Sequence, residues 1–282
     1  MSDRLPTTEA ELRHHISSIP MTGSVEERRK AFERIMPPCP AMAEPGTLGG
    51  VSGLYVGQGR TLALWLHGGG YVFGSARTHA AVAQRMAALA ECRIFLPDYR
   101  LAPEHPWPAM LQDACNVVQA CSGPVILIGD SAGGHLTLNV AAKMPDRIER
   151  LVLFSPNTDR TGANGLRQTN SAQDIMNDDA SDAALAGLAF QNNWDPQSPE
   201  LSPRLHDGLF PPIFLACTRG EVLHDDARLL RDKIQRQGGD VSYREYGQLF
   251  HMFEHWPDIL PDAQQALMDG ANFMKTGGLP KG

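Results

Sequence analysis

The sequence predicts an α/β protein with a largely parallel sheet that is covered by helices on both faces. From about residue 61 onward, short β-prone runs alternate with longer segments of helical periodicity, an order typical of parallel sheets. The 282 residues suffice to bury one large core, and no internal repeat interrupts them. The predicted strands span 61–66, 93–96, 124–128, 151–154, 213–217 and 241–246, and the predicted helices 78–90, 109–121, 134–143, 225–237 and 262–275.

Two stretches interrupt this alternation. Residues 1–45 are rich in charge and end near a Pro-Pro-Cys-Pro run, and residues 157–208 separate one predicted strand from the next. Connections in α/β units usually add about 2 to 6 residues to the helix, so the second stretch is too long for an ordinary loop. We expect an inserted cap or lid at 157–208, where the ligand is selected.

Composition and charge exclude several classes of protein. Hydrophobic residues make up 42% of the chain, yet it lacks the run of about 20 apolar residues needed to span a membrane. The first residues contain no signal-peptide core, so we expect a cytoplasmic location. The net charge of −7 disfavours nucleic acid as a partner. The five cysteines are odd in number and show no Cys-x-x-Cys spacing, which argues against a disulfide framework and a cysteine-rich zinc site.

The most informative motif lies at residues 125–136. An apolar strand runs into Gly-x-Ser-x-Gly at 129–133, and a helix is predicted to follow. This is the context of a nucleophile elbow, a sharp turn that holds a serine above the end of a sheet. Gly129 and Gly133 suit the turn because larger side chains would collide with the adjoining strand or helix. Ser131 is therefore the candidate nucleophile; the alternative is a glycine-rich turn with an incidental serine.

A second glycine-rich motif lies upstream. The predicted strand at 61–66 ends in His-Gly-Gly-Gly-Tyr at 67–71, which matches the oxyanion loop of one lipase and esterase group. We assign the backbone N–H groups of Gly69, Gly70 and Ala132 as donors to the negative charge of a tetrahedral intermediate. The alternative, a phosphate-binding loop, fits less well because no Gly-Lys-Ser/Thr follows the glycines.

Together with residues 98–109, which read Asp-Tyr-Arg-Leu-Ala-Pro-Glu-His-Pro-Trp-Pro-Ala, these motifs resemble the hormone-sensitive-lipase-like esterases of bacterial family IV type. The resemblance extends from about residue 62 to the C-terminus. It implies an α/β-hydrolase core at 46–156 and 209–282, with a helical cap formed by 1–45 and 157–208. It also implies hydrolysis of small-molecule esters of short acids without a metal or organic cofactor. A homodimer is one assembly that it allows.

The general base is expected after the last predicted strand. His251 lies there, where the family usually has His-Gly-Phe and this chain has His-Met-Phe. The order nucleophile, acid, histidine is the one this fold uses. Residues 251–255 also match His-x-x-Glu-His, the spacing of an inverted zinc-protease helix. Pro257 follows closely and disfavours a long helix there, so we interpret the second match as a coincidence.

The acid of the expected triad has two candidates. The family pattern resembles Asp-x-Leu-x-Asp, with its first Asp as the acid, and this chain has Glu221 in that place and Asp225 in the other. Glu221 follows a predicted strand directly and should face the site, whereas Asp225 should cap the next helix. The alternative for Glu221 is a solvated loop charge.

Three functions use these residues. Carboxylic-ester hydrolysis by Ser131, His251 and Glu221 is the first, and hydrolysis of a lactone or amide by the same residues is the second. The third is a binding protein that has lost catalysis, which the presence of both Ser131 and His251 disfavours.

Overall fold

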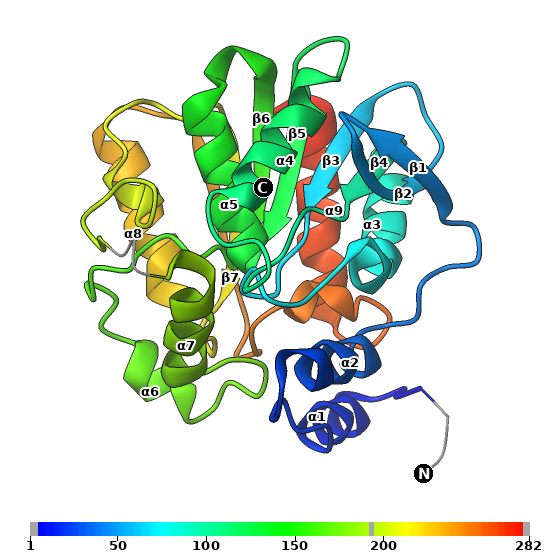
Figure 1. Cartoon of the computed structure of the whole chain (residues 1–282), viewed down its shortest axis with the longest axis vertical. Coiled ribbons are helices and arrows are strands. Elements are labelled where there is room, and N and C mark those ends of the chain that lie inside the picture. Colours follow the sequence, from blue (N-terminus) through cyan, green and yellow to red (C-terminus); the bar gives the residue numbers. More distant parts are fainter. Residues whose placement is uncertain (1–4, 192–194, 279–282) are drawn as a thin grey trace.

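The structure is a computed structural model that describes residues 5–191 and 195–278 (Figure 1). Residues 1–4, 192–194 and 279–282, which fall in the expected N-terminal, insertion and C-terminal ranges, lie outside the described residues. Within the described part of the chain, no helix is both long and apolar enough to cross a membrane. All five cysteines are free thiols.

The described residues form one eight-stranded sheet with the order β1-β2-β4-β3-β5-β6-β7-β8. All six predicted strands are present, and they pair in parallel, as the alternation of strands and helices predicts. Two further strands, which the sequence did not reveal, add an antiparallel edge. The strands are β1 Glu44–Leu48, β2 Val51–Gly57, β3 Leu62–Leu66, β4 Arg93–Pro97, β5 Val125–Asp130, β6 Ile148–Phe154, β7 Ile213–Thr218 and β8 Val241–Tyr246.

Helices cover both faces of the sheet, as expected. Helix α3 packs against α9 on one face, and α4, α5 and α8 cover the other (Figure 1). Right-handed crossovers produce this division, because the chain steps in one direction after β3 and in the other after β4. These helices are α3 Ala76–Ala90, α4 Ala109–Gln119, α5 Ser131–Lys143, α8 His224–Arg236 and α9 Pro261–Thr276.

The centre of the sheet is an apolar core. Strand β5 is buried along its whole length, because its neighbours and the helices on both faces cover it. Aromatic rings continue this core from β3 to β7: Trp65 stacks on Phe154 at 6.0 Å between centroids, and Phe154 contacts Phe214 at 6.2 Å. The core holds the C-terminal ends of the strands in fixed positions, and the functional motifs lie there.

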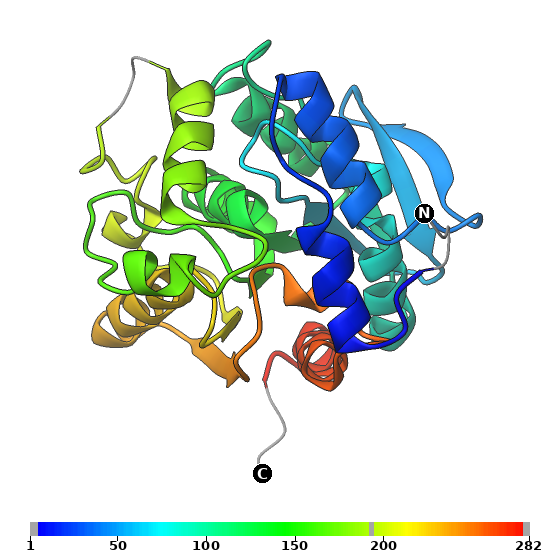
Figure 2. The ribbon, with the colours of Figure 1, turned by 90° about the horizontal axis from the view of Figure 1, so that it is seen from below.

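The N-terminal segment and the insertion lie at the end of the molecule to which the strands point (Figure 2). Arg29 fixes the N-terminal helices to the core, since its guanidinium donates to the carbonyls of Val72 and Ala102 and pairs with Glu104 at 2.8 Å. The remaining helices are α1 Glu9–Ser17, α2 Val25–Ile35, α6 Arg167–Ser171 and α7 Asp179–Phe190, with short 3-10 turns η1 Pro145–Arg147, η2 Pro203–Leu205 and η3 Phe253–His255.

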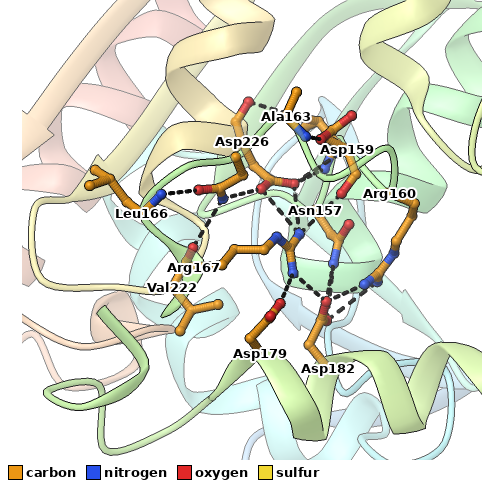
Figure 3. A network of polar contacts seen from close by, with 12 residues as sticks. Asn157, Asp159, Arg160, Ala163, Leu166, Arg167, Asp179, Asp182, Val222 and Asp226 are labelled. Carbon is orange, nitrogen blue, oxygen red and sulfur yellow. Dashed lines mark hydrogen bonds and ion pairs between the residues drawn. The ribbon is translucent and has the colours of Figure 1, made fainter. Parts of the chain in front are cut away.

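A buried network of charges fixes the insertion to the core (Figure 3). Arg167 of α6 pairs with Asp182 of α7 at 2.7 Å and with Asp226 of α8 at 3.1 Å. Asp226 also accepts hydrogen bonds from the backbone N–H groups of Thr158 and Asp159. Burial opposes ionisation of Asp182, but Arg160 and Arg167 outweigh it and hold the pKa of that carboxyl well below its usual range.

We predict that Arg167→Ala lowers the free energy of unfolding by about 3 to 5 kcal/mol, because it leaves Asp182 and Asp226 as buried charges short of a partner. Arg85→Ala is the control: Arg85 pairs with the exposed Asp258, and such pairs contribute about 1 kcal/mol or less. Urea unfolding of both variants measures the difference. Equal losses would contradict the role given to Arg167.

Candidate active site

The turn between β5 and α5 holds Ser131 in a strained conformation. Ser131 has φ +51°, in the left-handed region that residues other than glycine rarely adopt. A Cβ atom on Gly129 would lie 2.5 Å from the carbonyl oxygen of Gly133, so the turn leaves no room for a side chain there. This geometry matches a nucleophile elbow and presents the Ser131 hydroxyl at the end of the sheet.

The structure brings Ser131, His251 and Glu221 together in one hydrogen-bonded chain. His251 Nε2 lies 2.8 Å from Ser131 Oγ, and His251 Nδ1 lies 2.9 Å from Glu221 Oε2. His251 follows β8 and Glu221 follows β7, so both loops leave the sheet at its carboxyl edge, where active sites of α/β folds form. The distances are those that proton transfer from Ser131 to His251 requires.

Glu221 is completely buried, and its second oxygen is also occupied. Glu221 Oε1 accepts hydrogen bonds from Ser155 Oγ and from the backbone N–H of Thr218, both at 2.8 Å. These donors leave only Oε2 to face the histidine. Asp225, the other candidate acid, lies in the first turn of α8 and pairs with Arg228 at 2.8 Å.

The surroundings of His251 favour its charged form. Burial opposes the imidazolium, but the hydrogen bond and the negative charge of Glu221 outweigh burial and raise the pKa of His251 to about 9. An acid that stabilises the imidazolium makes the histidine a stronger base toward Ser131.

Of the three residues predicted to supply oxyanion donors, Gly69 and Gly70 line the same cavity as Ser131. Gly69 has φ +113°, a conformation that only glycine adopts readily, and a Cβ atom there would lie 2.3 Å from the carbonyl oxygen of Phe73. Gly70 follows with φ +60°. Ala132 lies in the first turn of α5, where backbone N–H groups have no acceptor inside the helix.

A cavity of about 270 Å³ opens above Ser131. Its wall combines apolar side chains from the N-terminal helices with residues of the insertion. The lining includes Ile16, Ile19, Phe32, Ile35, Gly69, Gly70, Ser131, Asp174, Met176, Asp178, Leu185 and His251.

Comparison with known proteins identifies the family. Residues 63–255 match the family model described as alpha/beta hydrolase fold. The chain belongs to this family. An acetyl-hydrolase of Streptomyces hygroscopicus is 31% identical over 90% of this chain and 91% of its own length. An esterase of Acinetobacter venetianus is 29% identical over 85% of this chain and 84% of its own length.

A solved structure places the chain more narrowly. It shares the fold of an esterase from the bacterial hormone-sensitive lipase family, with a TM-score of 0.88, 27% identity and coverage of 94% of this chain and 96% of the other. The resemblance inferred from the motifs is therefore confirmed. The protein is an esterase of the hormone-sensitive-lipase type within the α/β-hydrolase family.

One residue near the site of this esterase could not be found from the sequence. Asp174, in the insertion, accepts from four backbone N–H groups, those of His251 at 3.1 Å, Val222 at 3.0 Å, Met176 and Asn177. Its carboxylate thus joins the histidine loop, the acid loop and the insertion. Burial raises the pKa of Asp174, while the neighbouring His251 acts in the opposite direction.

Asn170 contributes to the same connection, because its side-chain amide donates to the backbone carbonyl of Glu221 at 2.8 Å. Both residues come from the long insertion, and only their polarity distinguishes them in the sequence. No local pattern relates them to loops that begin about 50 to 80 residues later.

The described residues contain two groups of possible metal ligands. One is Cys217, His224 and Glu245, where hydrogen bonds already connect His224 to Glu245 and Cys217 to Tyr243. The other consists of His79, Asp130 and His255, all buried. The His-x-x-Glu-His segment does not form the helix of a zinc protease: residues 253–255 are a 3-10 turn, and His251 contacts Ser131.

We predict that Asp174→Asn lowers kcat/KM by about 10- to 100-fold, because misplacing reacting groups by about 1 Å has effects of this size. It should also move the acidic limb of the pH–rate profile to lower pH, since a negative charge near His251 is lost. Asp178→Asn is the matched control: Asp178 lines the same cavity and caps α7, and asparagine also caps helices. A normal rate and profile for Asp174→Asn would exclude the positioning role.

We predict that kcat/KM rises with pH and reaches half its maximum in the alkaline range, near pH 9. Only neutral His251 can accept the Ser131 proton, and a raised pKa moves its deprotonation to higher pH. Initial rates between pH 6 and about 10 measure the curve, with a substrate whose spontaneous hydrolysis is subtracted. A plateau that is already reached at pH 6 would contradict the raised pKa.

Proposed function

We propose that this esterase hydrolyses short-chain carboxylic esters by acyl transfer through Ser131, His251 and Glu221. The observation that carries the proposal is the continuous chain of hydrogen bonds from Ser131 Oγ through His251 to Glu221 Oε2, which begins at the floor of the cavity. Ser155 also has a positive φ, but its hydroxyl donates to Glu221 and not to a histidine.

The proposed reaction begins when Ser131 Oγ attacks the ester carbonyl. His251 Nε2 takes the hydroxyl proton, and Glu221 stabilises the imidazolium that forms. The carbonyl oxygen becomes negatively charged, and the N–H groups of Gly69, Gly70 and Ala132 are assigned to it. His251 then gives its proton to the leaving alcohol. A water molecule repeats these steps on the acyl-enzyme, and the carboxylic acid is released.

The size of the cavity supports a small substrate. At about 270 Å³ it lies just below the usual range of ligand pockets, about 300 to 1,000 Å³. We propose that residues 1–45 and 157–208 act together as the cap, because Phe32 and Ile35 come from the first and Met176 and Leu185 from the second. The similarity to an acetyl-hydrolase agrees with a short acyl group.

We predict that kcat/KM for p-nitrophenyl acetate or butyrate exceeds that for the laurate by at least about tenfold, because extra methylenes find no room in the cavity. Soluble butyrate should also be hydrolysed faster than emulsified triolein. Aryl esters, lactones and anilides tested in parallel separate the possible leaving groups. Ser131→Ala should remove turnover of every substrate, and turnover that persists would refute Ser131 as the nucleophile. If the wild type hydrolyses none of these substrates, the proposed hydrolase function is wrong.

We predict that Glu221→Gln lowers kcat by up to about 10⁴-fold, as removal of the acid does in other triads. Asp225→Asn is the matched comparison, because Asp225 pairs with Arg228 and should affect mainly stability. Steady-state kinetics with a thermal melt of each variant measures both effects. If Glu221→Gln kept nearly full activity and Asp225→Asn were inactive, Asp225 and not Glu221 would be the acid of the triad.

A further inference from the structure

Glu254 and His255 complete the His-x-x-Glu-His segment but take no part in the proposed triad. Both side chains are fully buried. Both carboxylate oxygens of Glu254 and both ring nitrogens of His255 lack a hydrogen-bond partner among the described residues. Buried polar atoms are nearly always paired, because leaving them unpaired costs their hydration without return. These four atoms together therefore indicate a missing partner.

His79 and Asp130 lie next to this pair. One ligand atom each from His79, Asp130 and His255 lies within 4.8 Å of the other two. The rings of His79 and His255 are 4.7 Å apart between centroids. Glu254 Oε1 is 3.7 Å from His255 Nε2, beyond hydrogen-bond distance. Two imidazoles and two carboxylates thus lie near the end of β5, the strand that leads to Ser131.

The hydrogen bonds around His79 determine where its proton lies. The Thr78 hydroxyl donates to the carbonyl of Ser75 at 2.9 Å, so its oxygen can only accept from His79 Nδ1, also at 2.9 Å. Nδ1 therefore carries the proton, and the Nε2 of the neutral ring has a lone pair. This Nε2 lies 3.1 Å from Asp130 Oδ2, which is also an acceptor. The backbone N–H of Gly68 donates to the same Nε2 at 3.1 Å, so a metal ion that binds there would replace this donor and lie between the two acceptors.

We propose that His79, Asp130, Glu254 and His255 bind one divalent metal ion of the zinc class. Tetrahedral zinc with N and O ligands at about 2.1 Å places neighbouring ligand atoms about 3.4 Å apart. The separations of 3.1 Å between His79 and Asp130 and 3.7 Å between Glu254 and His255 lie on either side of that value. Glu254 stands outside the three ligand atoms that lie within 4.8 Å of one another, so its carboxylate must turn toward them to complete the site.

The charges and the outer contacts also suit such an ion. The carboxylates of Asp130 and Glu254 together balance two positive charges. Thr78 orients His79, and Trp65 Nε1 donates to Asp130 Oδ1 at 2.8 Å, the kind of outer contact that fixes metal ligands.

An ion could reach the site through a cavity other than the substrate cavity, although Ile35 lines both. A second cavity, of about 320 Å³, lies between the N-terminal segment and the loop before α9, and His255 forms part of its wall. The ion would connect α3, the end of β5 and the histidine loop. Because Asp130 directly precedes Ser131, its expected effect is to hold the strand end and the strained turn, not to contact the ester.

Metal analysis of the untagged, full-length enzyme tests this proposal. Wild type, His255→Phe, Glu254→Gln and His224→Gln are each expressed with added zinc, or loaded with Co²⁺ during refolding because the site is buried. After removal of loosely bound metal, the metal content is measured by plasma mass spectrometry and Co²⁺ by its visible absorption. His224→Gln is the matched control, because it alters the other group of possible ligands. Far-UV circular dichroism verifies that each variant is folded, because turnover depends on the turn that the ion is proposed to hold.

We expect about one metal ion per wild-type chain and per His224→Gln chain, with a raised melting temperature in the loaded form. The content should fall at least about tenfold in His255→Phe and in Glu254→Gln. If one of these two variants fails to fold, the metal content of the other still tests the proposal. Wild type that binds neither zinc nor Co²⁺, equal binding by wild type and the folded variants, or loss of binding only in His224→Gln would each overturn the proposal.

Discussion

The sharp turn between β5 and α5 is the constraint on which the whole site depends. Ser131 keeps its positive φ only because the chain on both sides is tightly held. Gly133 makes this possible, since its Cα approaches the carbonyl of Leu66 so closely that a Cβ atom could not fit between them. The same approach brings the start of α5 next to the end of β3, where the glycine-rich loop begins. One packing contact therefore fixes the candidate nucleophile relative to the proposed oxyanion donors.

The insertion does more than cover the cavity. Its buried ion pairs fasten it to α8, and Asp174 and Asn170 hold the backbones of the loops that carry His251 and Glu221. The segment proposed to cap the cavity thus also holds the loops of the candidate base and the candidate acid. The four N–H groups compensate the cost of burying the carboxylate of Asp174.

Local patterns predicted most of the fold because parallel strands and their helices have clear periodicity. The edge strands β1 and β2 escaped prediction because β1 is largely exposed and polar, and glycines interrupt β2. The role of Asp174 was not predicted for another reason: its partners come from loops that meet only in three dimensions. The alternation that revealed β3 to β8 contains no information about which loop a polar residue of the insertion will contact.

The sequence by itself determined the α/β architecture, the elbow around Ser131 and the glycine loop, because each depends on residue types at short, regular spacing. It also limited the candidates for the acid of the expected triad to two residues. Only the tertiary structure decided that Glu221 lies against His251 while Asp225 pairs with Arg228. The gathering of His255 with His79 and Asp130 was likewise decided by the fold. Such contacts join residues far apart in the chain, so packing of the strands and helices must be complete before they exist.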